Sequence, residues 1–190
     1  EEALDPHWLE NFRRVHLVAC GTAYHAALVG KCLLEGLARL PAEAELASEF
    51  RYRQPLVDQD TLVVVISQSG ETADTRAALR EARARGAGVL AIVNVVGSSI
   101  AREAERVLYT WAGPEIAVAS TKAYSCQVAV LTVLALHLGR LRGTLSADEA
   151  RRLGCLLRGL PAQVEEVLAR ADRIEQVARQ VAGHEDVFFI

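Results

Sequence analysis

The sequence is poor in several features that mark common functional classes. It has no methionine, only 5% aromatic residues and a formal net charge of −3. Such a weak charge produces no large field toward nucleic acid or an anionic membrane, so neither is expected as a partner. No segment approaches about 20 uninterrupted apolar residues, and no signal peptide is recognisable, which favours a cytoplasmic protein.

Missing motifs exclude further classes. The chain contains no G-x-G-x-x-G, no G-x-x-x-x-G-K-[ST] and no G-x-S-x-G sequence. Sites for dinucleotides, nucleoside triphosphates and α/β-hydrolase chemistry therefore lose support. The four cysteines and five histidines show no metal-ligand spacing. We expect reduced thiols, no metal and no cofactor.

What is present is an alternation of strand and helix patterns. Short β-branched or apolar runs occupy 14–19, 43–47, 61–66, 88–93 and 106–111. Helical patterns separate or follow them over 23–39, 72–85 and 119–138, with a short one after Ser99. This alternation predicts an α/β fold: a five-stranded parallel sheet in a flavodoxin-like, three-layer α/β/α sandwich.

The composition changes after Gly143. Residues 144–186 show only helical patterns; Ser146 and Glu149 form a capping box, and Pro161 is expected at the first position of another helix. We therefore expect one domain over 1–143 and trailing helices over 144–186, packed on it or linking to a further domain. Residues 187–190 predict the start of a truncated strand, as in a piece of a longer protein.

The most informative loop follows the buried run 61–66. It reads Ser67-Gln68-Ser69-Gly70-Glu71-Thr72 and leads into a helix. Ligands of open parallel sheets bind beyond the carboxyl ends of the strands. Three hydroxyls, a glycine free to adopt positive φ and the free N–H groups of a helix start suit a phosphate better than a plain helix cap.

Two other loops at the same sheet edge carry small polar residues. Cys20-Gly21-Thr22 follows the first strand, and by itself it is better interpreted as a structural strand-to-helix turn. Val118-Ala119-Ser120-Thr121-Lys122 leads into the long helical pattern over 119–138. For Lys122 a solvated side chain is favoured over an anion contact. The charged segment 49–53 is interpreted equally as an ordering contact for a nearby loop or as a subunit contact.

Taken together, these residues resemble one family, the glutamine–fructose-6-phosphate aminotransferases, also called glucosamine-6-phosphate synthases. The matching segment of that family is the first sugar-isomerase (SIS) subdomain, and the resemblance covers nearly the whole chain. It is carried by Cys20-Gly21-Thr22, the stretch 47–53, Ser67 to Asp74, Asn94 to Ser99 and Glu115 to Ala123.

The resemblance implies that Ser67, Gln68, Ser69 and Thr72 bind the phosphate of fructose 6-phosphate or glucosamine 6-phosphate. It also implies that Cys20, Gly21, Thr22, Val118 and Ser120 line the sugar. Some relatives carry serine where this chain has Ala23, so one hydroxyl contact is missing here.

The family's acid–base residues lie in a second SIS subdomain, its Schiff-base lysine in a C-terminal tail and its glutaminase in an N-terminal domain. The resemblance therefore implies no catalytic residue within this chain, binding without turnover, and a homodimer in the complete enzyme. Two alternatives stay open: a stand-alone SIS module that senses a phosphosugar and regulates a partner, and a flavodoxin-like redox domain. The low aromatic content speaks against the redox domain, since flavin sites often stack the ring on Tyr or Trp.

Overall fold

The computed structural model describes residues 4–116 and 120–188. By its internal contacts the chain divides into two units, residues 1–150 and residues 151–190, which are described separately. The first unit holds the whole sheet and the helices α1 to α6. It contains all the site residues predicted from the sequence.

The sheet of the first unit has five parallel strands in the order β2-β1-β3-β4-β5. Its strands are β1 (Arg14–Ala19), β2 (Ala42–Leu46), β3 (Thr61–Ser67), β4 (Gly88–Val93) and β5 (Arg106–Tyr109). Every residue of β3 and β4 is buried, because both strands are covered on both faces. The predicted five-stranded parallel sheet and its flavodoxin-like order are confirmed.

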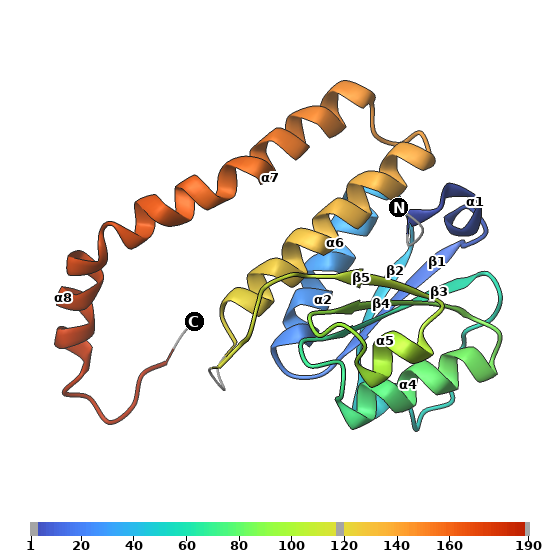
Figure 1. Cartoon of the computed structure of the whole chain (residues 1–190), viewed down its shortest axis with the longest axis horizontal. Helices are drawn as coiled ribbons and strands as arrows, with labels where there is room; N and C mark the ends of the chain where they lie inside the picture. The colour runs from blue at the N-terminus through green and yellow to red at the C-terminus, as the bar shows by residue number, and fades with distance from the viewer. Residues whose placement is uncertain (1–3, 117–119, 189–190) are drawn as a thin grey trace. The chain divides into compact units, whose positions relative to one another are not determined.

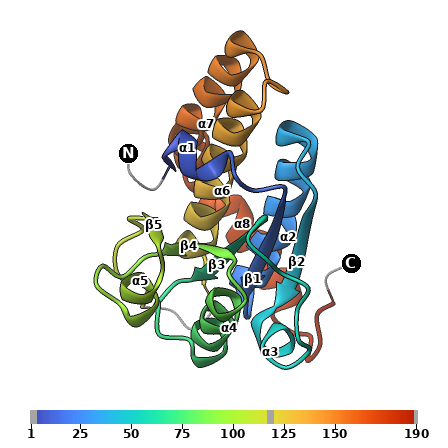
Figure 2. The same cartoon turned by 90° about the vertical axis from the view of Figure 1, so that its right-hand side faces the viewer.

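Helices cover both faces of this sheet (Figures 1 and 2). They are α1 (Pro6–Leu9), α2 (Thr22–Leu33), α3 (Ala47–Phe50), α4 (Ala73–Ala84), α5 (Ser99–Glu103) and α6 (Lys122–Leu141). A π-helical turn, η2 (Leu34–Ala38), extends α2. The sequence predicted α6 three residues early at both ends, over 119–138.

Alternate residues of β3 belong to two separate cores. Leu62, Val64 and Ile66 pack in the core that includes buried residues of α2 and α6. Val63 and Val65 pack in the other, with buried residues of α4 and α5. This division confirms the predicted three layers, since successive side chains of a strand point to opposite faces.

By length and composition alone, α6 is apolar enough to cross a membrane. Its Leu131, Leu134 and Leu138 are nevertheless buried in the α2 side of the core. We therefore describe α6 as a core helix of the sandwich.

The helices of the trailing segment are α7 (Ala147–Leu168) and α8 (Ala171–Val181). Half of the predicted capping box is present at the start of α7, where the Glu149 N–H donates to Ser146 Oγ over 3.2 Å. The prediction for Pro161 is wrong, because Pro161 lies inside α7 and starts no new helix. A proline removes one N–H donor and costs about 3 kcal/mol inside a helix, yet the exposed flanks of α7 leave the freed carbonyl open to water.

The predicted strand at 187–190 is not formed over Val187 and Phe188, and 189–190 lie outside the described residues. A strand needs a neighbour to hydrogen-bond with, and no strand of the described chain pairs here. That part of the domain division stays a prediction.

Candidate functional site

The 67–72 loop connects the last residue of β3 to the first turn of α4. Gly70 takes a φ of +68°, which only glycine adopts without strain. Ser67 Oγ accepts a hydrogen bond from the Gly70 N–H at 3.0 Å and lies 3.0 Å from Thr72 Oγ1. Ser69 Oγ accepts from the Glu71 N–H at 3.1 Å. These bonds gather three hydroxyls in one tight turn.

The amino end of α4 adds backbone donors to these hydroxyls. Thr72 is the N-cap residue, but its side chain makes no capping hydrogen bond. The first N–H groups of an α-helix have no partner within the helix, and the helix dipole places partial positive charge there. Hydroxyls and free N–H groups of this kind are the donors with which a helix start can bind a phosphate-sized anion without a lysine.

Arg51 fixes the first turn of α4 from outside. Its guanidinium, at the end of α3, lies 2.7 Å from Asp74 Oδ1 and 4.7 Å from the centre of the Tyr52 ring. Of the two interpretations of segment 49–53, this ion pair supports an ordering contact. Tyr52 remains 75% exposed, and the interpretation as a subunit contact stays untested.

Glu71 is the one acidic residue of the 67–72 loop, and its carboxylate is engaged at the start of α5. Glu71 Oε1 accepts from the Ser99 N–H at 2.7 Å. This backbone donor, with the Ser99 side chain and the charges of Arg102 and Arg76, lowers the pKa of Glu71. The carboxylate is thus held at the start of α5 in its charged form.

A buried serine packs against the back of the loop. Ser98 is 4% exposed, and its Oγ has no hydrogen-bond partner among the described residues. A Cβ placed on Gly70 would lie 2.0 Å from that Oγ. The Gly70 carbonyl also accepts from the Ile100 N–H at 3.0 Å. Gly70 therefore satisfies two demands, positive φ and a close approach of the β4–α5 connection.

The Cys20-Gly21-Thr22 loop lies beside the 67–72 loop. Ala19 of β1 pairs with Ile66 of β3, so the next residues, Cys20 and Ser67, leave adjacent strands at the same sheet edge. Gly21 has a φ of +61°, and a Cβ there would meet nothing within 4 Å. Gly21 and Thr22 are exposed, whereas Cys20 is partly buried against the α4 side of the core. The turn therefore leaves open space around Gly21.

The third predicted loop, residues 118–122, is described only in part. Val118 lies outside the described residues, and Ser120 is partly buried just before α6. Glu115 Oε2 accepts from the Ala123 N–H at 3.2 Å and so ties the loop to the start of α6. Lys122 is exposed, in keeping with a solvated side chain.

Asn94 is a residue to which the sequence assigned no role. It follows β4 directly, and its amide group contacts the chain after β5 through both of its polar atoms. Its position was the available signal for a functional role, because ligands of open parallel sheets bind beyond the carboxyl ends of the strands, and Asn94 directly follows a buried strand. Asparagine is also common in turns, so residue type and position alone do not favour a functional role.

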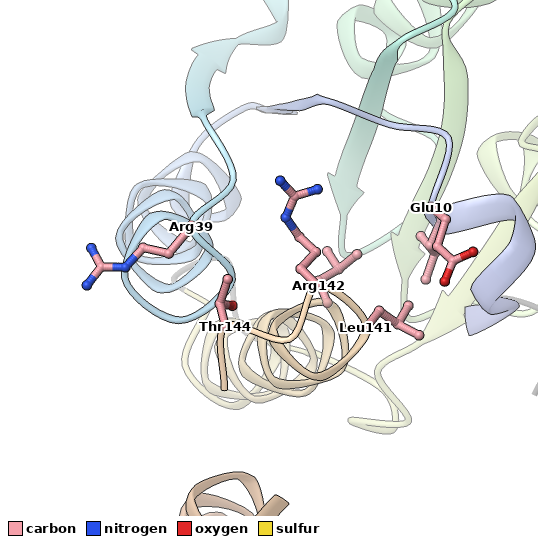
Figure 3. A pocket seen from close by; sticks show the side chains of 7 residues that line it. Glu10, Arg39, Leu141, Arg142 and Thr144 are labelled. Atoms are coloured by element: carbon pink, nitrogen blue, oxygen red, sulfur yellow. The ribbon is translucent and has the colours of Figure 1, made fainter. Parts of the chain in front are cut away.

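A pocket of about 340 Å³ lies at the opposite edge of the sheet, near the amino ends of β1 and β2 (Figure 3). Glu10 and Arg39 lie on either side of Arg142 in this view. Arg142 Nε donates to Ala38 O at 3.1 Å, and Thr144 Oγ1 donates to Leu37 O at 2.7 Å. These side chains satisfy carbonyl groups in the last turn of η2, so we interpret this pocket as structural.

Comparison with known proteins gives the same family from two directions. The SIS domain family profile matches residues 9–137. The glutamine–fructose-6-phosphate aminotransferase (isomerizing) of Symbiobacterium thermophilum is 61% identical over 94% of this chain and 29% of its own length. An enzyme of that name from Thermus thermophilus is 52% identical over 99% of this chain and 31% of its own length.

A solved structure agrees in fold as well as in sequence. The C-terminal domain of glucosamine-fructose-6-phosphate aminotransferase from Francisella tularensis superimposes with a TM-score of 0.91 at 36% identity. The match covers 95% of this chain and 51% of that one. The chain thus spans about 30% of the length of the curated relatives that it matches. The family match and the five-stranded parallel sheet agree, and the chain belongs to the SIS domain family.

Proposed function

We propose that the carboxyl edge of the sheet binds a hexose 6-phosphate. In this proposal Ser67, Gln68, Ser69 and Thr72 hold the phosphate at the start of α4. The observation that carries it is that three loop hydroxyls gather in one turn directly before the free N–H groups of a helix start. The residues proposed to line the sugar are Cys20, Gly21, Thr22, Val118 and Ser120.

The names of the relatives support a particular substrate and reaction for the complete protein. We infer that the chain is the sugar-phosphate-binding part of an enzyme that converts fructose 6-phosphate and glutamine to glucosamine 6-phosphate and glutamate. The proposal includes a glutaminase domain and a second SIS domain in the complete protein, a cytoplasmic location and a homodimer. The identity of 50–61% to curated aminotransferases supports the enzyme over a stand-alone sensor.

The chain by itself is proposed to bind but not to catalyse. Proton transfer on a sugar needs a positioned acid–base group within reach of the substrate. The one carboxylate of the 67–72 loop, Glu71, is held by the Ser99 N–H and has a lowered pKa, so it is a poor general base. We therefore assign no catalytic residue to these 190 residues.

Calorimetric titration of the chain with fructose 6-phosphate and glucose 6-phosphate tests the proposal. We expect weak binding of both, no binding of unphosphorylated fructose, and no formation of glucosamine 6-phosphate. Ser69→Ala should weaken binding, while Ser125→Ala, on the exposed side of α6, serves as the matched control. A folded chain, by circular dichroism, that binds neither sugar phosphate contradicts the proposal.

A further inference from the structure

Asn94 uses its side-chain amide to organise the chain that follows β5. Asn94 Oδ1 accepts from Thr110 Oγ1 at 3.0 Å and from the Ala112 N–H at 2.8 Å. Asn94 Nδ2 donates to the Gly113 carbonyl at 2.7 Å. These bonds fix the orientation of the amide, because only the oxygen accepts and only the nitrogen donates. Three residues of the 110–113 segment are thus fastened to one side chain.

The backbone of the same residue is bonded to the 67–72 loop. The Asn94 N–H donates to the Gln68 carbonyl over 3.2 Å. Asn94 therefore contacts the loop proposed to hold phosphate through its main chain, and the 110–113 segment through its side chain. The two contacts lie on one residue at the end of a buried strand, which gives them a rigid base.

The 110–113 segment has little regular structure of its own. Trp111 has a φ of +51°, which is unfavourable for a residue with a side chain, and it is 75% exposed. Such a conformation persists where surrounding contacts fix it. Asn94 supplies two of these contacts, on the residues directly after Trp111. From Gly113 the chain continues through Glu115 toward Ser120 and α6.

We propose that Asn94 is a positioning residue that sets the distance between the 67–72 loop and the 110–113 segment. For its ligand this inference rests on the proposed function. It assigns Asn94 a specificity role: the phosphate contacts only the 67–72 loop, whereas the sugar of a hexose 6-phosphate also contacts Ser120, which follows the 110–113 segment in the chain. Loss of the amide should therefore weaken binding of the sugar phosphate and spare binding of inorganic phosphate.

The test uses Asn94→Ala, Asn94→Leu and the control Asn11→Ala. Asn11 also donates its side-chain amide to backbone carbonyls, those of His7 and Trp8, but it precedes the amino end of β1. NMR titration with inorganic phosphate and with fructose 6-phosphate gives the two affinities. Hydrogen exchange of the Ala112 amide, in the absence of ligand, reports whether the segment is held.

In Asn94→Ala we expect Ala112 exchange and the dissociation constant for fructose 6-phosphate each to rise about tenfold, as for loss of one or two hydrogen bonds. The phosphate affinity should change less than twofold, because the main-chain bond to Gln68 remains. Asn94→Leu removes the same amide at nearly the same side-chain shape without adding charge, so it gives the same comparison if Asn94→Ala fails to fold. Asn11→Ala should change none of these values.

Two results overturn the inference. One is unchanged exchange at Ala112 in Asn94→Ala; the other is an equal loss of affinity for both ligands. A wild-type chain that binds no sugar phosphate removes the proposed function instead, and the Ala112 exchange still decides whether Asn94 holds the segment.

Discussion

The Oγ of Ser98 lies 2.0 Å from the point that a Cβ on Gly70 would occupy. Ser98 is buried and therefore has little room to move aside. The two residues come from consecutive β–α connections, so their contact fixes how closely the 67–72 loop approaches the start of α5.

Gly70→Ala should lower the free energy of unfolding by about 2–4 kcal/mol, from left-handed strain and overpacking together. It should also abolish sugar-phosphate binding. Gly86→Ala is the matched control, because Gly86 has a φ of +82° and open space around a Cβ. That variant should lose only about 1–2 kcal/mol and keep its affinity. Urea unfolding and calorimetric titration measure both quantities; equal losses in the two variants would rule out the steric part.

Ser67 and Ser69 should separate stability from binding. Ser67 is 3% exposed, and its Oγ accepts from the buried Gly70 N–H, so Ser67→Ala leaves that donor unpaired. We expect a loss of about 1–3 kcal/mol in unfolding free energy together with weaker binding. Ser69→Ala, at a more exposed position, should weaken binding with little change in stability. Thermal unfolding and titration of the two variants side by side would expose the opposite pattern.

Glu103 should make stability depend on pH. Hydrogen bonds from Arg80 and then Arg76 lower the pKa of Glu103 from 4.5 to about 2. A pKa lowered by folding adds stability that is complete above pH 4.5 and is lost as the pH falls toward 2. Both arginines are partly exposed, so solvent screening keeps the contribution below about 1 kcal/mol.

Glu103→Gln should therefore be less stable than wild type at pH 7, and the difference should fall to less than half by pH 3. Urea unfolding at both pH values gives this difference. Glu105→Gln, an exposed carboxylate two residues further on, is the control. A Glu103→Gln defect of the same size at pH 7 and pH 3 would show that the carboxylate charge is not its source.

Thr144→Val should affect stability at the opposite edge and leave binding intact. The Thr144 hydroxyl donates to Leu37 O at 2.7 Å, and Val has the same shape without the donor. We expect a loss of about 1–2 kcal/mol in unfolding free energy and an unchanged affinity for fructose 6-phosphate. A clear loss of affinity in a folded Thr144→Val chain would mean that the pocket near Arg142 is coupled energetically to the loops proposed to bind the sugar phosphate.

The sheet could be predicted from the sequence because β3 and β4 are continuous apolar runs, which have few other stable uses. The turn at Ser67–Thr72 could be predicted because glycine and hydroxyl residues at a strand-to-helix junction have specific geometric uses. The prediction of a helix start at Pro161 was wrong because proline favours the first position of a helix, but a solvent-exposed helix also tolerates the one hydrogen bond that an internal proline removes.

Asn94 was missed for a different reason. Its partners Ala112 and Gly113 are 18 and 19 residues away, and two of its three side-chain bonds go to backbone atoms. Backbone atoms carry no sequence signal, so the pattern of side chains contains no trace of that contact. The hydrogen bond from the Ser99 N–H to Glu71 is hidden in the same way.

The register of the sheet has a consequence for how the loops at its carboxyl edge tolerate change. Ala19 pairs with Ile66, and Ser67 pairs with Val93, so the first residues after three neighbouring strands leave the sheet almost level. Slipping β3 by one residue would exchange its two faces and displace the loop by about 3.3 Å at once. Strand length therefore sets the positions of the ligand-binding loops relative to one another. An insertion within a strand should abolish ligand binding, while an insertion in a loop at the other edge of the sheet should leave binding unchanged.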